Sequence, residues 1–352
     1  MESIYYVISW LCHRRCKHCY DDRFRPYVRG ALKRVVDEST ANYTAIVDHL
    51  PETMMYRDVD DPDPDGAIRT RRGRIILSGG EVLVDPIREP VLYPLLERLE
   101  RRYRDKGGVN VIIQTTGDHL DERILEQLLR RGVWSVSVAG MDDFHVGMEG
   151  DKKLRRQEQL TALFERMGMR RSGHRAGERK WTDEDGPLYS FFGANPDTWI
   201  GKLWPRGRAW ENGLSKATMA DNFCNAWSGG LNFLRYGFSG SEVSIEPNGN
   251  VYPCCMKTKL PLGNLVEESL IDILASLQGH PVFEGISNGH PERMGLGYGW
   301  DVGQFYDMSQ TLSPDGRPYR NLCIGCDRFY DTFMAPVLRE MTERRRRARL
   351  AA

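Results

Sequence analysis

The sequence predicts an α/β protein in which successive strand and helix units build a parallel sheet. Over the first half of its 352 residues, short apolar runs alternate with longer amphipathic runs, and Gly107 and Gly132 stand where two helices should stop. That alternation is typical of strands joined by helices that cover a sheet, and glycine is common just beyond a helix end. Further along, the pattern changes to that of an antiparallel hairpin. We therefore expect a large β/α domain followed by a smaller one.

The elements of the first domain follow from these patterns. The predicted strands are residues 4–9, 74–77, 109–115 and 133–138, and the predicted helices are residues 32–50, 86–103 and 122–131. The stretch 58–66, rich in Asp and Pro, should be a surface loop. Residues 141–190 contain one helical segment, 154–167, and no other clear period, so we expect an excursion or lid within a domain that spans residues 1–220.

The last third predicts a second domain and a terminal helix. Residues 243–252 alternate around Asn248-Gly249, which is a strong signal for a two-residue hairpin turn. We place the second domain at residues 221–330 and a basic helix at residues 331–352. The run Arg344 to Arg347 would suit an RNA-binding tail, but a run of charges is more often a solvated face. We therefore expect no nucleic-acid partner.

Composition and charge exclude several classes of protein. Lysine plus arginine and aspartate plus glutamate both number 49, so the net charge favours neither nucleic acid nor an anionic membrane. No apolar run approaches the length of a membrane span, and the first ten residues are too few and too polar for a signal peptide. We expect a cytoplasmic protein with no membrane partner. Its eight cysteines would stay reduced there, which favours metal binding or catalysis over disulfides.

Three of the cysteines form a cluster directly after the first predicted strand. Cys12, Cys16 and Cys19 are separated by three and two residues. A loop of this length can place three thiolates on one face of a cubane iron-sulfur cluster and leave the fourth iron without a protein ligand. Two other interpretations are a zinc site completed by His13 or His18, although this spacing is not the usual zinc pattern, and three cysteines without metal. The sequence favours the cubane.

This cluster resembles the signature of the radical S-adenosylmethionine (SAM) superfamily, which places it after the first strand of a partial (β/α)6 TIM-like barrel. The segment Ser78-Gly79-Gly80-Glu81 follows the second predicted strand and resembles the Gly-Gly-Glu segment of that family. The resemblance implies a 4Fe-4S cluster, SAM as cofactor, and contacts from Gly79, Gly80 and Glu81 to the SAM amino group. Glycines permit close backbone approach and a carboxylate suits an ammonium group.

Further cofactor contacts are implied at the ends of later strands, where β/α barrels collect their active-site groups. In similar enzymes such polar positions contact the ribose or carboxylate of SAM, and each has a structural alternative. The candidates are Thr115, Thr116, Ser135 and Ser137. Tyr20 would pack against the cluster or the adenine, or else belong to the core. Asp142, Asp143 and His145 either line the cavity or form a solvated loop.

The remaining five cysteines resemble the auxiliary-cluster domains called SPASM or, in their shorter form, twitch. Gly207-Arg208-Ala209 is similar to the segment that often precedes such a domain. The resemblance implies a second 4Fe-4S cluster held by Cys224, Cys254, Cys323 and Cys326. Cys254 and Cys255 could exchange roles, and a structural zinc ion is the main alternative. Cys255 is either a hydrogen-atom donor to a substrate radical or a buried bystander.

The function implied by the resemblance is reductive cleavage of SAM to methionine and a 5'-deoxyadenosyl radical, which removes hydrogen from an unactivated carbon. A flavodoxin-type or ferredoxin-type protein would supply electrons, and the auxiliary cluster would transfer them. Peptide-modifying members often carry a leader-binding domain before the barrel, and eleven residues precede Cys12. We therefore expect a small-molecule substrate of natural-product or sugar type. A peptide maturase and a noncatalytic iron-sulfur or zinc scaffold are the alternatives.

Overall fold

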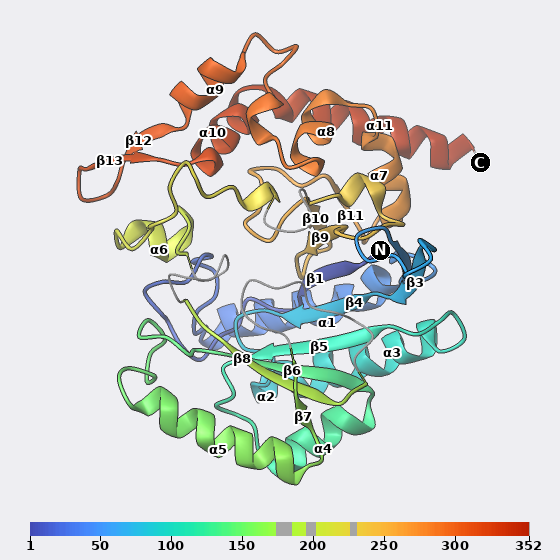
Figure 1. The fold of residues 1–352 in the computed structure, drawn as a ribbon, viewed down its shortest axis with the longest axis vertical. Helices are drawn as coiled ribbons and strands as arrows, with labels where there is room; N and C mark the ends of the chain where they lie inside the picture. Colours follow the sequence, from blue (N-terminus) through green and yellow to red (C-terminus); the bar gives the residue numbers. More distant parts are fainter. Residues whose placement is uncertain (174–184, 195–201, 226–230, 352) are drawn as a thin grey trace.

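A nine-stranded sheet runs through the centre of the molecule (Figure 1). The computed structural model describes residues 1–173, 185–194, 202–225 and 231–351. In order across the sheet, the strands are β11 (Gly263–Asn264), β10 (Asn250–Tyr252), β9 (Glu242–Ile245), β1 (Ser3–Val7), β4 (Arg74–Ser78), β5 (Asn110–Thr115), β6 (Val133–Ala139), β8 (Leu188–Phe192) and β7 (Arg170–Arg171). Neighbours from β9 to β7 are parallel, and β10 and β11 are antiparallel at one edge. The predicted α/β architecture is confirmed.

The first half of the chain supplies helices that pack against this sheet. They are α1 (Arg29–Asp48), α2 (Asp85–Ile87), α3 (Tyr93–Tyr103), α4 (Glu122–Arg130) and α5 (Lys152–Arg166), with a π-helical turn, η1 (Arg88–Leu92), between α2 and α3. Helix α4 shows how the sequence sets these elements. The side chain of Asp121 caps its start by accepting a hydrogen bond from the Ile124 amide at 2.7 Å. Leu125 and Leu128 are fully buried, and Gly132, at φ +77°, follows its end.

The second half is mostly helical and lies near the β9–β11 end of the sheet, whereas α4 and α5 lie near the other end (Figure 1). Its helices are α6 (Gly207–Glu211), α7 (Leu270–Leu277), α8 (Pro281–Ser287), α9 (Val302–Met308), α10 (Leu322–Phe329) and α11 (Ala335–Ala351). Two hairpins stand outside the main sheet, β2 (Met55–Asp58) with β3 (Arg69–Arg72), and β12 (Gln310–Leu312) with β13 (Pro318–Arg320). None of the described helices is long and apolar enough to cross a membrane.

The stretch 141–190 differs from the excursion or lid that we expected. Its helical segment is α5, and the chain then reaches β7 and β8, which are the next parallel strands beside β6. Strand β8 (Leu188–Phe192) was not predicted. Its apolar run is only five residues long and follows a charged stretch without a clear period. Part of the predicted excursion, residues 174–184, lies outside the described residues.

The predicted hairpin at 243–252 forms, but it belongs to the central sheet. Strands β9 and β10 pair as an antiparallel hairpin, and β9 also pairs in parallel with β1, with Ile4 opposite Val243. All four residues of β9 are buried, so both faces of this strand are covered. The predicted boundary at residue 221 thus falls between segments that share one sheet.

The terminal basic helix is docked against the rest of the chain. Arg345 of α11 is buried and makes a bidentate ion pair with the buried carboxylate of Glu268, at 2.8 and 2.9 Å. Arg349 also donates to Glu268, at 2.5 Å. Two arginines of this helix are therefore structural, one of them, Arg345, within the basic run.

Candidate functional site

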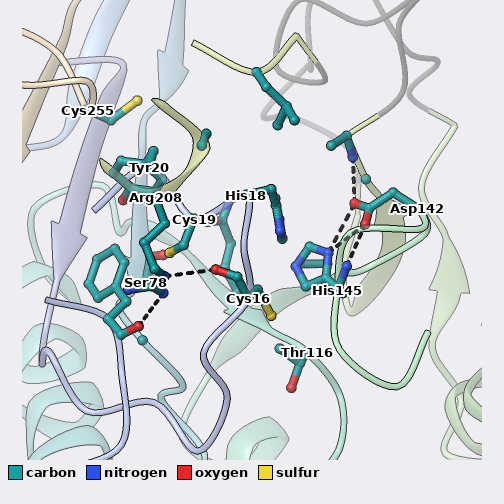
Figure 2. Close-up of a pocket in the computed structure, with 18 of the residues that line it drawn as sticks. Cys16, His18, Cys19, Tyr20, Ser78, Thr116, Asp142, His145, Arg208 and Cys255 are labelled. Carbon is teal, nitrogen blue, oxygen red and sulfur yellow. Dashed lines mark hydrogen bonds and ion pairs between the residues drawn. The ribbon is translucent and has the colours of Figure 1, made fainter. Parts of the chain in front are cut away.

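The cysteines of the first cluster line a cavity next to the carboxyl ends of β1, β4, β5 and β6 (Figure 2). The chain leaves β1 at Val7 and turns through a loop that contains Cys12, Cys16 and Cys19, all of which face this cavity. Backbone amides point at two of the sulfur atoms: Arg14 N lies 3.4 Å from Cys12 Sγ, and Val146 N lies 3.4 Å from Cys16 Sγ. Amide dipoles directed at sulfur stabilise thiolates and the sulfur ligands of clusters.

The thiols of this loop are held protonated by their surroundings. Burial raises the pKa of Cys12 to about 12 and of Cys19 to about 11, and it also raises the pKa of Cys16. Three thiols with raised pKa values would have to lose their protons to bind a metal, since a metal ligand has to be deprotonated. Metal loading of this loop is therefore coupled to proton release.

One group of side chains in the described part of the chain lies close enough together to hold a single metal ion. Among the described residues, one set of three or more His, Cys, Asp or Glu side chains has all its ligand atoms within 4.8 Å of one another, and it consists of His18, Asp142 and His145. A tetrahedral zinc ion with bonds of about 2.3 Å holds its sulfur ligands about 3.8 Å apart. Among the described residues, no set of three cysteines meets this 4.8 Å limit.

The glycines of Ser78-Gly79-Gly80-Glu81 let this segment lie directly against the cysteine loop. A Cβ atom on Gly80 would lie 2.8 Å from Cys12 Cβ and would overlap Leu11 O, and one on Gly79 would lie 2.7 Å from Ser9 O. The Gly80 amide also donates to Ser9 O at 3.1 Å. Gly79 and Gly80 line the cavity beside Cys12, so this part of the expected cofactor site is brought together.

Glu81 has a different place from the one we expected. Its side chain is 1% exposed and is not among the groups that line the cavity. One carboxylate oxygen accepts from Thr115 Oγ1 at 2.6 Å and from the Leu83 amide at 3.0 Å, and the other accepts from the Thr116 amide and hydroxyl at 2.8 and 2.7 Å. Glu81 therefore fixes two residues of the cavity wall from behind, and its oxygens are already satisfied.

The four polar strand-end candidates separate into two groups. Thr115 and Thr116 line the cavity, where their hydroxyls bond to Glu81. Ser135 and Ser137 are buried in β6 and are not among the residues that line it, and Ser137 Oγ lies 2.9 Å from Ser190 Oγ.

Tyr20 lies in the cavity wall as part of a small hydroxyl network. Tyr5 Oη lies 2.7 Å from Ser78 Oγ and 3.4 Å from Tyr20 Oη. Burial raises the pKa of both tyrosines well above the ordinary value, so their hydroxyls stay protonated. The sequence analysis did not single out Tyr5, although a tyrosine in an otherwise apolar strand was a usable signal. Gln114 in β5 also lines the cavity and was also not singled out, although a glutamine in an otherwise apolar strand was a usable signal.

The loop after β6 contains Asp142, Asp143 and His145. Asp142 and His145 line the cavity, and Asp143 does not. His145 Nδ1 lies 2.9 Å from Asp142 Oδ1, and the Ala194 amide donates to Asp142 Oδ2 at 2.7 Å. Figure 2 shows the His145 ring between Asp142 and His18, and the ring centroids of the two histidines are 4.3 Å apart. Burial lowers the pKa of His18 to about 4, so this ring is neutral. Asp143 points outward to Lys153.

The other cysteines form a second site behind the cavity. Four of them, Cys224, Cys254, Cys323 and Cys326, line one small pocket. Cys323 and Cys326 lie three residues apart on α10, whose first turn is held by Asn321 Oδ1 accepting from the Cys323 amide at 2.9 Å. Burial raises the pKa of Cys254 to about 12 and of Cys323 to about 11, and it also raises the pKa of Cys224 and Cys326.

Adjacent cysteines in the sequence go to different sites. Cys254 faces the four-cysteine pocket, whereas Cys255 lines the first cavity together with Tyr20 and Met256. The four cysteines that the resemblance assigns to a second cluster therefore line one pocket, and Cys255 faces the space next to the first cluster loop. The direction of each side chain depends on the turn that ends β10, which the sequence pattern alone does not specify.

For several residues, nothing in the sequence indicated that they belong to the cavity. Arg208 was noted as part of a motif only, yet its buried guanidinium donates to Cys16 O at 2.9 Å, Asp22 O at 2.9 Å and Phe24 O at 2.7 Å (Figure 2). Residues 192–194 and 202–204 also line the cavity. They arrive from parts of the chain that carry no motif, so tertiary structure alone brings them here.

Comparisons with known proteins bear on the second site most directly. Residues 238–287, which include Cys254 and Cys255, match SPASM, an iron-sulfur cluster-binding domain. No curated protein matches the chain.

Solved structures similar to the chain include three that carry SAM or a peptide. BtrN in complex with AdoMet and 2-DOIA has 16% identity and a TM-score of 0.44, over 82% of this chain and 88% of that one. Streptococcus suis SuiB bound to S-adenosylmethionine has 12% identity and a TM-score of 0.38, over 81% and 67%. Native anSMEcpe with bound AdoMet and Cp18Cys peptide has 14% identity and a TM-score of 0.42, over 96% and 98%.

The domain match concerns the second site, and the first site is described by its own geometry. The match covers Cys254 and Cys255, and the loop of Cys12, Cys16 and Cys19 keeps the radical SAM spacing with Gly79 and Gly80 packed against it. Residues 238–287 therefore match an iron-sulfur cluster-binding domain of the SPASM type, as the resemblance of this region predicted.

Proposed function

We propose that the protein is a radical SAM enzyme that removes a hydrogen atom from an unactivated carbon of a small molecule. The observation that carries the proposal is that the three cysteines of the first loop face one cavity, and that Gly79 and Gly80 form the wall beside them. When bound there, a 4Fe-4S cluster and SAM supply a 5'-deoxyadenosyl radical. The protein contributes the ligands, the orientation and the exclusion of water.

Specific residues would hold the cofactors. Cys12, Cys16 and Cys19 would be the cluster ligands, and the backbone of Gly79 and Gly80 would lie against SAM. Thr115 and Thr116, fixed by Glu81, offer hydroxyl and backbone groups to the same ligand. Tyr20 and the neutral ring of His18 provide flat surfaces on the same cavity wall that suit a purine base. We no longer assign direct SAM contacts to Glu81, Ser135 or Ser137.

The cavity also supports a substrate of limited size. Its wall is largely apolar and aromatic, including Phe24, Phe192 and Trp204. An apolar wall limits water and stray hydrogen donors, which a primary carbon radical would otherwise consume. Polar groups that could orient a hydroxylated substrate stand on the same wall, among them Gln114, the Tyr5 hydroxyl and Asp142. This combination is typical of small-molecule sites.

The SPASM region would hold the second 4Fe-4S cluster and transfer electrons. Cys224, Cys254, Cys323 and Cys326 surround one pocket and supply four thiolates, so a cubane held there has no iron left for substrate. We therefore propose electron transfer for it. A flavodoxin-type or ferredoxin-type protein of the cytoplasm would supply electrons to the first cluster.

Cys255 gives a second candidate reaction, in which its thiol returns a hydrogen atom to the substrate radical. The observation that favours it is that Cys255 faces the cavity and not the four-cysteine pocket. Burial raises its pKa well above the ordinary value, so it is a thiol with an S–H bond to donate. As the S–H bond of Cys255 breaks and the C–H bond of the substrate forms, Cys255 would be left as a thiyl radical, which would return to the thiol by taking up a proton and one electron from the auxiliary cluster. The net result would be epimerisation instead of oxidation. A Cys255→Ser variant that still makes 5'-deoxyadenosine but no longer epimerises would support this reaction.

The test of the proposal is anaerobic reconstitution of the full chain with iron and sulfide. We expect about eight irons per chain, and about four after Cys12, Cys16 and Cys19 are changed together to alanine. With a reductant and SAM, the wild type should release 5'-deoxyadenosine and the triple variant should not. Zinc in place of iron, or no 5'-deoxyadenosine with a broad panel of small molecules, would favour the scaffold. Turnover only with a peptide would favour the maturase.

A further inference from the structure

Residues 206–209 contact both cysteine sites. Arg208 donates to Cys16 O and to two further carbonyls of the first cluster loop, and the Ala209 amide donates to Cys19 O at 3.3 Å. Arg206, two residues earlier, instead contacts the second site. Gly207 joins them at φ +47°, where a Cβ atom would lie 2.6 Å from Tyr20 O. The two sites are therefore joined by one short segment of backbone.

The side chain of Arg206 is held rigidly beside the four auxiliary cysteines. Its Nε donates to Met256 O at 3.0 Å, while Nη1 and Nη2 donate to the two oxygens of Asp327 at 2.8 and 2.9 Å. Arg206 and Asp327 are only 13% and 20% exposed. Asp327 follows Cys326 directly on α10, and Arg206 lines the same pocket as the cysteines. A bidentate pair of this kind fixes the guanidinium in one position.

A charge fixed there acts on the electrons of a cluster. A cubane held by four thiolates is anionic and becomes more so when it takes up one electron. Nearby charge and hydrogen bonding are among the main determinants of such reduction potentials, and charges act strongly on each other where water is largely excluded. A cation beside the sulfur ligands stabilises the reduced form, and a carboxylate destabilises it.

We propose that Arg206 sets the reduction potential of the auxiliary cluster and that Asp327 is the counter-charge that holds it in place. This inference rests on the proposed function, because it requires a cluster at Cys224, Cys254, Cys323 and Cys326. Arg206 is a positioning residue that acts through the cluster and contacts no substrate. Because of Arg206, the auxiliary cluster has a higher reduction potential than four cysteine ligands alone would give it. A cluster that is easier to reduce suits the role of electron acceptor.

The experiment is a redox titration of reconstituted full-length protein, followed by electron paramagnetic resonance. The Arg206→Gln variant should lower the midpoint potential of the auxiliary cluster, because a buried carboxylate is left without its cation. Asp327→Asn should raise it, and the double variant should lie between the two. Arg206→Lys keeps the charge but loses the bidentate geometry, so its shift should be smaller than that of Arg206→Gln. The first cluster should keep its potential in all four.

Arg328→Gln is the matched control. Arg328 lies on the same helix as Cys323 and Cys326, but its guanidinium donates to Met308 O at 2.8 Å, and the auxiliary potential should not change. The inference is overturned if Arg206→Gln and Asp327→Asn both leave the potential unchanged at full iron content. If the Arg206→Gln variant loses the auxiliary cluster, the Asp327→Asn variant alone tests the inference. A higher midpoint potential of the auxiliary cluster in that variant supports the inference, and an unchanged potential refutes it. About four irons in the wild type would instead refute the proposed function.

Discussion

The two cysteine sites differ in how the chain builds them. Cys12, Cys16 and Cys19 lie within eight residues of one loop and open onto a large cavity, whereas the auxiliary cysteines come from three segments that span residues 224 to 326 and surround a small pocket. A buried ion pair, Arg206 with Asp327, accompanies the second site. At the first site a ligand has room beside the cysteines, and at the second it does not. An open site of this kind suits a reaction on a bound ligand, whereas an enclosed site suits electron storage or transfer.

The largest effect that would break this comparison is expected at Gly80. A Gly80→Ala change places a methyl group 2.8 Å from Cys12 Cβ and against the backbone oxygen of Leu11, so the first loop must move. We expect iron content to fall from about eight to about four and 5'-deoxyadenosine formation to be lost, while the auxiliary signal remains. Gly237→Ala, where the methyl group would meet nothing within 4 Å, is the control. Equal loss from both clusters would show that the sites are not independent.

A second test separates the two adjacent cysteines. Cys254→Ser removes a thiolate from the four-cysteine pocket and should abolish or strongly weaken the auxiliary cluster, lowering iron by up to about four per chain. Cys255→Ser should leave the iron content unchanged, because Cys255 faces the other cavity. Iron and sulfide analysis of the two variants measures this. The opposite pattern would mean that the two cysteines exchange roles.

A smaller effect is expected at the start of α10. Asn321 is fully buried, caps the helix that carries two auxiliary cysteines, and donates from Nδ2 to Thr218 O at 2.9 Å. Asn321→Ala should reduce the free energy of unfolding by about 1 to 2 kcal/mol, and the auxiliary cluster should be lost to a chelator faster than the first one. Chemical denaturation and the rate of iron release measure both effects. Asp301→Ala, at the cap of α9, controls for loss of a cap away from the cysteines.

The smallest expected effect concerns His18 and pH. Burial holds its folded-state pKa at about 4, below the value of about 6.5 in an unfolded chain. At pH 7 the ring is neutral in both states, but at pH 5 only the unfolded chain binds the proton, so acid favours unfolding. Between pH 7 and 5 the wild type should therefore lose on the order of 1 kcal/mol more stability than His18→Gln. Denaturation midpoints of the cluster-free chain at the two pH values measure this, and equal losses would contradict it.

Most of the first domain was predictable because its signals are local. The strands β1, β4, β5 and β6 appear as short apolar runs, and the observed ends lie within two residues of the predicted ones. The first cysteine loop follows β1 directly, so its place at the carboxyl end of a strand followed from the order of elements. Strand β8 and its pairing with β6 were not predicted, because a charged stretch precedes it and parallel pairing joins distant residues.

The candidate site was predicted where residue type alone carries the chemistry. The cysteine positions and the need for glycine at residues 79 and 80 are properties of this kind. The role of Glu81 could not be predicted from residue type, because a carboxylate after two glycines can face a ligand or turn back into the cavity wall. It turns back because the hydroxyls of Thr115 and Thr116, 34 and 35 residues later, satisfy its oxygens.

The sequence by itself determined the α/β class, the spacing of the first three cysteines and the existence of a second cysteine-rich region, because each depends on residues close together in the chain. Only the tertiary structure decided that β9 joins β1, that Cys254 and Cys255 face different sites, and that Arg206 and Arg208 connect the two. These features depend on contacts between segments up to about two hundred residues apart. Long-range contacts of this kind are selected by packing and burial over the whole molecule, and no local pattern of residues encodes them.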